Sequence, residues 1–170
     1  MIHGPFLNQA RVCESILRAL PEWFGIEAAI RGYLAEIEAL PTCLAVVEEQ
    51  IVGFLALKYH TEHAAEIYVM GLRPDYHRRG LGRSLVARAE EVLRNNGIEY
   101  LQVKTLSPSV PNEHYTRARA FYHAMGFRAL EESKQIWGER NPCLLMVKYL
   151  DERNRFKKTE GSAQWPLSFV

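Results

Sequence analysis

The segment from His77 to Ser84 combines basic side chains with two closely spaced glycines, and such a segment can bind phosphate. It follows an apolar run that ends at Pro74 and precedes a helical pattern that begins near Leu81. A helix N-terminus presents unpaired backbone N–H groups and a partial positive charge, and glycines let a phosphate approach the backbone. We therefore predict an anion site in this loop. Its residues are His77, Arg78, Arg79, Gly80, Leu81, Gly82, Arg83 and Ser84.

Two other kinds of phosphate loop do not fit these residues. A dinucleotide-binding G-x-G-x-x-G needs a third glycine where this chain has Leu85, and a P-loop needs Gly-Lys-Ser/Thr, which the sequence lacks. Arg78, Arg79 and Arg83 carry positive charge that suits a pyrophosphate or a 3′-phosphate. Taken alone, the segment would also fit a basic turn before an ordinary helix.

A second motif lies about forty residues further on. Between Tyr115 and Phe127 the sequence reads Ala-x-x-Phe-Tyr-x-x-x-Gly-Phe, at the end of a predicted helix. Together with a Gln/Arg-x-x-Gly-x-Gly/Ala loop that follows a strand, this motif resembles the GNAT superfamily of N-acetyltransferases. The order of elements from about Ile26 to Leu150, roughly three quarters of the chain, is also similar to that family.

The resemblance implies an α/β fold of the α+β kind, with a mixed, mostly antiparallel sheet, helices on both faces and a splayed strand pair. We expect one domain over residues 1–150, whose helical part at 1–42 borders the acceptor site, and a polar tail at 151–170. The implied activity is direct transfer of an acetyl group from acetyl coenzyme A to a primary amine in a ternary complex. The alternatives are an acyl coenzyme A sensor without catalysis and an interaction module.

The resemblance also implies contacts with the coenzyme and a catalytic acid. The backbone of Met70 and Leu72, on the splayed strand, would contact the thioester and the pantetheine arm. Tyr122 matches the tyrosine that protonates the leaving thiolate, although its helical spacing alone would favour a packing residue. His77 stands where the family usually has Gln or Arg, and Tyr115 stands where an Asn often contacts the coenzyme.

The acceptor amine must lose a proton before it attacks, and the resemblance offers candidates for the base. Glu66, at the start of the splayed strand, matches a position where relatives often carry a base that acts through water. A solvated strand-end carboxylate is the other interpretation of this residue. His114 is a second candidate base and water a third. Trp23 and Tyr33 would line the acceptor pocket, whose substrate the sequence does not identify.

Composition excludes several other classes of protein. The 170 residues carry 21 Lys plus Arg against 20 Asp plus Glu, and a net charge of +1 argues against a nucleic-acid platform. No metal is expected, because His60, His63 and Glu66 lie on a predicted strand connection where this spacing does not converge ligands. Without a membrane-length apolar run or a leader pattern, the cytoplasm is expected. Three cysteines fit reduced thiols: Cys13, Cys43 and Cys143.

Hydrophobic periodicity predicts the elements that position these residues. Residues 1–7 leave room for a first strand that is short or absent. Predicted helices cover 9–20, 26 to Pro41, 81–95 and the segment through 118–125. Predicted strands cover 44–47, 51–57, 65–72, 100–106, 127–136 and 143–150. By analogy with the family, the last strands and the tail after Asp151 would form a homodimer contact.

Overall fold

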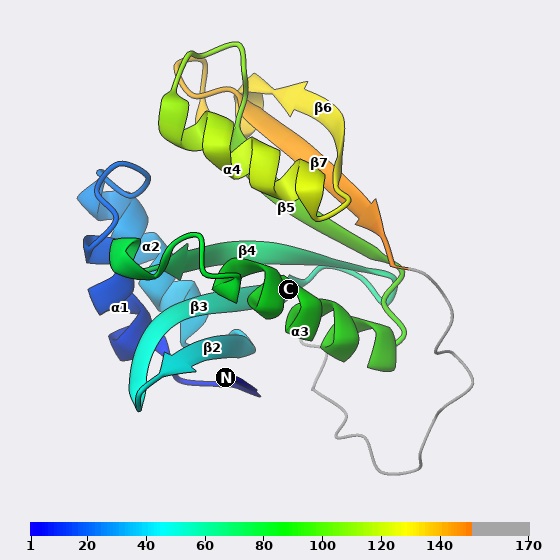
Figure 1. The fold of residues 1–170 in the computed structure, drawn as a ribbon. Helices are drawn as coiled ribbons and strands as arrows, with labels where there is room; N and C mark the ends of the chain where they lie inside the picture. Colours follow the sequence, from blue (N-terminus) through cyan, green and yellow to red (C-terminus); the bar gives the residue numbers. More distant parts are fainter. Residues whose placement is uncertain (151–170) are drawn as a thin grey trace.

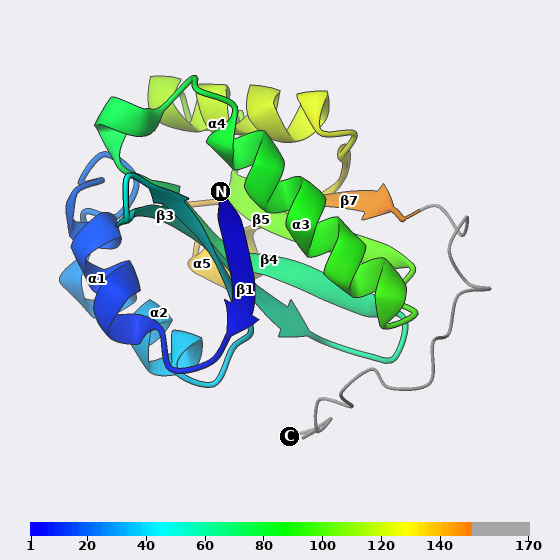
Figure 2. The same ribbon diagram turned by 60° about the horizontal axis from the view of Figure 1, so that its bottom comes forward.

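The computed structural model describes residues 1–150, in which a seven-stranded sheet carries helices on both faces (Figures 1 and 2). The strands are β1 (Ile2–Phe6), β2 (Thr42–Val47), β3 (Gln50–Tyr59), β4 (Ala64–Leu72), β5 (Tyr100–Leu106), β6 (Arg128–Ser133) and β7 (Cys143–Tyr149). The helices are α1 (Ala10–Arg18), α2 (Glu27–Ile37), α3 (Leu81–Asn95), α4 (Glu113–Ala124) and α5 (Lys134–Trp137), with a 3-10 turn, η1 (Pro74–Tyr76). No helix of this part of the chain is both long and apolar enough to cross a bilayer.

The strand order is β1-β2-β3-β4-β5-β7-β6, and every neighbouring pair is antiparallel except β4 with β5. The parallel ladder runs over four residue pairs, from Ala64 with Tyr100 to Ile67 with Val103, and stops there. Figure 1 shows β4 and β5 close together at one end and diverging toward the other. The predicted mixed sheet with a splayed strand pair is therefore confirmed.

A β-bulge marks the point where β4 turns away from β5. In the β3–β4 ladder Ala56 pairs with Val69 and Leu57 pairs with Ile67, so Tyr68 is the extra residue of β4. A bulge bends its strand and increases the local twist. Because this bulge directly follows the last residue of the parallel ladder, it bends β4 where the splay begins.

The sheet separates two hydrophobic cores. One core lies under α3 and α4 and includes Leu93, and the other lies under α1 and α2 and includes Ile16. Strand β3 contributes to both, because successive side chains point to opposite faces: Leu55 belongs to the first core and Phe54 to the second. Burial on both faces explains why the strand reads as a continuous apolar run.

Most elements predicted from periodicity are present. The predicted hairpin is confirmed as β2 and β3, and the predicted helix over 81–95 is α3. Gly97, just beyond α3, has a φ of 80°, the left-handed conformation expected of a helix C-cap. Cys13, Cys43 and Cys143 are free and buried, as predicted.

Two boundaries differ from the prediction. The first strand, left open as short or absent, is present as β1, five residues that pair antiparallel with β2. The strand predicted over 127–136 ends at Ser133, whose side chain accepts a hydrogen bond from the Gln135 N–H and caps α5. A serine N-cap stabilises a helix start, which explains why the strand gives way to a helix there. The tail predicted at 151–170 lies outside the described residues.

We predict that the packing of α1 on β4 depends on Gly71. A Cβ at this position would lie 3.1 Å from Leu20 Cδ1 and 3.2 Å from Ile16 Cγ2. Gly71→Val should lower the free energy of unfolding by about 1–3 kcal/mol through overpacking, measured by urea denaturation. Gly32→Ala is the control, because Gly32 on α2 has open space around it. This variant should raise the free energy of unfolding by about 0.5–1 kcal/mol. An unchanged midpoint for Gly71→Val would contradict the close approach.

Candidate active site

The second half of β4 exposes one edge of its backbone where β5 has departed. The Arg73 N–H donates to the Val52 carbonyl at 2.8 Å. By the alternation of an antiparallel ladder, Met70 and Leu72 then direct their N–H and C=O groups away from β3. On that side the pairing with β5 has already ended at Ile67. Met70 and Leu72 therefore face the opening of the splay with their main-chain groups.

The predicted anion loop leads into the N-terminus of α3. Gly80 precedes the helix with φ 81° and ψ −9°, a left-handed conformation that favours glycine. The first intrahelical bond is donated by the Ser84 N–H to the Gly80 carbonyl at 3.0 Å. No residue among 1–150 accepts from the backbone N–H of the three residues between them, Leu81, Gly82 and Arg83. These orphan donors are the kind that bind an anion at a helix N-terminus.

Three arginines accompany these N–H groups. Arg78, Arg79 and Arg83 are exposed and form no ion pair within the described part of the chain. The Arg79 guanidinium lies over the Tyr76 ring, 5.0 Å from its centroid, which positions it without neutralising it. The loop therefore combines unpaired backbone donors with uncompensated positive charge.

His77 connects this loop to the end of β4. Its Nε2 lies 2.7 Å from the Leu72 carbonyl, and because a carbonyl only accepts, the imidazole donates. The ring also meets Trp23 edge-on at a centroid distance of 6.1 Å. His77 thus fixes the loop relative to the splayed strand, whereas direct phosphate binding by this side chain stays a prediction.

Tyr122 has a buried ring and a hydroxyl without a protein partner. The residue is 9% exposed, and its ring packs edge-on against Phe121 and Phe127 at centroid distances of 5.4 and 5.7 Å. Within residues 1–150 no group forms a hydrogen bond to its hydroxyl. Burial, reinforced by Tyr115 and Tyr33, raises the pKa of Tyr122 well above its usual value. The ring serves packing, and the hydroxyl remains a protonated donor.

The N-terminus of α4 is attached to the joint between α1 and α2. The Tyr115 hydroxyl donates to the Trp23 carbonyl at 3.0 Å, and the His114 ring meets the Trp23 ring edge-on at 4.8 Å. His114 Nε2 lies 3.5 Å from a Glu22 carboxylate oxygen, and its buried Nδ1 has no partner. The hydroxyl of Tyr115 thus has a protein partner, so its predicted coenzyme contact remains a prediction that would involve other atoms of the residue.

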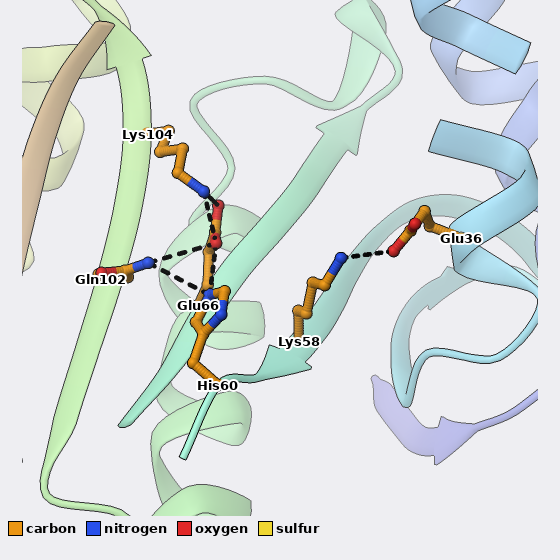
Figure 3. Close-up of polar contacts among 6 residues, drawn as sticks. All are labelled: Glu36, Lys58, His60, Glu66, Gln102 and Lys104. Atoms are coloured by element: carbon orange, nitrogen blue, oxygen red, sulfur yellow. Dashed lines mark hydrogen bonds and ion pairs between the residues drawn. The ribbon is translucent and has the colours of Figure 1, made fainter. Parts of the chain in front are cut away.

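Glu66 is buried at the closed end of the splay and is surrounded by donors (Figure 3). Only 2% of the residue is exposed, so the interpretation as a solvated strand-end carboxylate is wrong. Lys104 Nζ lies 2.9 and 3.1 Å from its two oxygens, and His60 Nε2 lies 2.7 Å from one of them. Gln102 donates to the same oxygen at 3.3 Å. The carboxylate is thus held in a fixed position between β4 and β5.

The contacts of Glu66 determine its charge. Burial alone would raise the pKa of this carboxyl, but hydrogen bonds from His60 and Lys104 outweigh burial and hold the pKa below its usual range. Glu66 is therefore ionised at neutral pH and able to accept a proton. A carboxylate with a lowered pKa holds an accepted proton weakly, so it would readily pass that proton to a second acceptor nearby.

An aromatic row lies on the same face of the sheet as Glu66. Phe24 meets Tyr33 at 5.8 Å, and Tyr33 meets Tyr68, the bulge residue, at 5.6 Å, both edge-on. Lys58 lies over the Tyr68 ring at 5.0 Å and pairs with Glu36 at 2.6 Å (Figure 3). Of the predicted acceptor residues, Tyr33 belongs to this row, whereas Trp23 contacts His77 of the predicted anion loop and His114 of α4.

Sequence reasoning missed four residues of this site. The sequence suggests His60 only as a metal ligand, a role it argues against, and it marks Tyr68, Gln102 and Lys104 as ordinary strand residues. Only Tyr68 had a local signal, because it lies two residues from Glu66 on the same strand. Gln102 and Lys104 reach Glu66 through the pairing of β4 with β5. Across residues 1–150 no three His, Cys, Asp or Glu side chains converge in a way that could hold a metal ion.

The candidate site thus combines three features: a splayed parallel strand pair, an open helix N-terminus and a tyrosine hydroxyl without a partner among residues 1–150. The family model of the acetyltransferase (GNAT) family matches residues 10–127, more than half of the chain. The chain is a member of the acetyltransferase (GNAT) family.

Similar proteins extend this comparison. An uncharacterized N-acetyltransferase from Chlorobaculum tepidum is 28% identical over 97 residues, and the match covers 55% of this chain and 56% of that protein. The fold is similar to that of a GNAT-family protein from Desulfovibrio desulfuricans, with TM-score 0.74, 16% identity, and coverage of 89% of this chain and 99% of that one. A GNAT-family acetyltransferase from Elizabethkingia anophelis with acetyl-CoA bound has TM-score 0.67, 18% identity and coverage of 88% and 97%.

We predict that the Glu66 cluster makes stability depend on pH. A lowered folded-state pKa means that ionised Glu66 stabilises the fold, fully above the ordinary glutamate value of about 4.3 and less as pH falls through the folded-state value. Glu66→Gln should therefore be less stable than the parent at pH 7, and the difference should shrink below pH ~4. Urea unfolding at both pH values tests this, with the exposed Glu62→Gln as the control. A difference independent of pH would contradict it.

Proposed function

We propose that this protein is an acetyl coenzyme A-dependent N-acetyltransferase that moves the acetyl group directly to a primary amine in a ternary complex. One observation carries the proposal: three orphan N–H groups at the start of α3, among three arginines without ion pairs in the described residues, adjoin the splay of β4 and β5. The membership in the acetyltransferase family and the acetyl-CoA held by the Elizabethkingia relative support it further.

The coenzyme would lie along the opening with its phosphates at α3. The pyrophosphate would accept from the N–H groups of Leu81, Gly82 and Arg83, where backbone donors and the helix dipole favour an anion. The pantetheine arm would pair with the free backbone edge of β4 at Met70 and Leu72. Since the Leu72 carbonyl already accepts from His77, this residue would contribute its N–H. The thioester carbonyl would then be polarised by fixed main-chain donors.

The transfer itself needs a proton acceptor and a proton donor. We assign the acceptor to Glu66, acting directly or through one water, rather than to His114. The amine lone pair then forms the N–C bond to the carbonyl carbon, and the C–S bond breaks. We assign Tyr122 as the donor that protonates the departing thiolate, because its hydroxyl is protonated and has no partner among residues 1–150. The second proton that the nitrogen loses as it becomes an amide replaces, through solvent, the proton that Tyr122 gives to the thiolate.

The compartment, the acceptor and the oligomeric state are argued from other features. Three buried, unpaired cysteines fit a reducing compartment such as the cytoplasm. The acceptor would be a small molecule or a peptide with a free amine. A second copy of the chain would contact the edge strand β6, where Leu130 is 63% exposed.

We predict that a bulky residue at Gly82 blocks the coenzyme. A Cβ there would lie 3.4 Å from Leu72 and from Phe121, and a larger side chain would occupy the phosphate site. Calorimetric titration should give micromolar binding of acetyl coenzyme A to the parent protein, weaker binding of ATP and NAD, and at least tenfold lower coenzyme affinity for Gly82→Leu. The control is Gly32→Leu, another helical glycine, which has open space. Equal affinity of both variants would refute the loop assignment.

We also predict that Tyr122→Phe lowers kcat by about 10²-fold or more while leaving the coenzyme affinity unchanged, because it removes the acid and keeps the ring. Thiol release from acetyl coenzyme A with primary amines measures kcat, and calorimetry measures affinity. Phe121→Leu is the control for packing changes next to the site. Unchanged turnover in Tyr122→Phe would remove this residue as the acid. Coenzyme binding without turnover by the parent protein on any amine would favour the sensor instead.

A further inference from the structure

His60 connects the buried carboxylate of Glu66 with solvent. It closes the turn between β3 and β4, where its N–H donates to the Ala64 carbonyl at 2.9 Å. Its Nε2 lies 2.7 Å from Glu66, and 33% of its side chain is exposed, against 3% of the Glu66 side chain. Figure 3 shows His60 and Lys104 on opposite sides of the carboxylate. The imidazole is thus partly exposed, somewhat more than the Lys104 side chain at 25%.

The other neighbours of Glu66 cannot take a proton from it. Lys104 offers an ammonium, which has three donors and no acceptor, and the Gln102 amide does not change its charge. Lys58, opposite Glu66 on β3, is engaged by Glu36. Burial raises the pKa of the remaining titratable groups, so they stay protonated at neutral pH: Tyr33, Tyr68 (to about 12) and Cys143 (to about 11).

Acetylation of an ammonium releases one proton in each turnover, and a buried base must pass this proton on. Histidine is the side chain that takes up and gives up protons readily near neutral pH, and its ring nitrogens can both accept and donate. A carboxylate that is held ionised by Lys104 gives an accepted proton to an imidazole in contact with it.

We propose that His60 is the proton outlet of Glu66 in the acetyl transfer, a role that rests on the proposed function. The N–H bond of the acceptor ammonium breaks as an O–H bond forms on Glu66. In this step the neutral ring carries its proton on Nδ1, and the O–H bond breaks as an N–H bond forms on His60 Nε2. The products are an ionised carboxylate and an imidazolium whose Nε2–H donates to it. The imidazolium loses a proton to bulk water. Exchange of the ring protons with water through the exposed edge then restores the accepting nitrogen.

Two substitutions separate proton transfer from positioning. His60→Gln keeps an amide that can donate to Glu66 but cannot carry a proton, and His60→Ala leaves a gap at the surface that free imidazole can enter. The control is His63→Gln, a neighbouring histidine that contacts Glu62 and Glu99 instead. The assay is thiol release from acetyl coenzyme A with the best amine from a panel of amino acids, polyamines and peptides.

The outlet role predicts that kcat falls about 10–100-fold in His60→Gln and in His60→Ala, while KM for acetyl coenzyme A stays the same. Added imidazole should restore kcat in His60→Ala and not in the parent or in His63→Gln. Parent-like kcat in His60→Gln, or no effect of imidazole on a folded His60→Ala, would overturn the outlet and reduce His60 to a positioning residue. If the parent itself turned over no amine, the proposed function would fail instead, so the two failures are distinguishable.

Discussion

The parallel ladder between β4 and β5 ends after four residue pairs, at Ile67 and Val103. Buried backbone N–H and C=O groups need partners, because each one left unsatisfied costs about 1–3 kcal/mol. Beyond this point β4 keeps β3 on one edge and leaves the other edge to whatever occupies the opening. An extended ligand can complete such an edge by main-chain hydrogen bonds, as in β-strand addition. The rest of the candidate site is arranged around this edge.

Side-chain contacts connect β4 to its surroundings where the backbone ladder with β5 ends. At the closed end of the splay, Lys104 on β5 reaches both oxygens of Glu66 on β4, so an ion pair continues the connection between the strands. Near the other end of β4, His77 donates to the Leu72 carbonyl and holds the anion loop against the strand. Removal of one partner of a buried pair costs more than the pair contributes, since an uncompensated charge remains. The geometry of the opening is therefore fixed from both ends.

The same arrangement changes what some residues can do. Glu66 looked like an exposed base at a strand end, whereas the structure buries it among three donors that keep it ionised. The predicted coenzyme contact of Tyr115 stays a prediction, and the structure adds that its hydroxyl donates to the Trp23 carbonyl and joins α4 to the N-terminal helices. The Tyr122 ring packs in the core and its hydroxyl stays without a partner in the described chain, so its role as the acid stays a prediction. Long-range contacts determine the surroundings of Glu66 and Tyr115.

The sequence by itself determined the features that depend on neighbouring residues. Helical and strand periodicity placed α3 and the β2–β3 hairpin, and Gly97 marked the left-handed cap after α3. Only the tertiary structure decided the presence of β1, which depends on pairing with β2, and the Glu66 cluster, in which His60 and Gln102 lie 42 residues apart. Those contacts follow from strand register and from the length of the β4–β5 ladder, and neither quantity has a local signature in the chain.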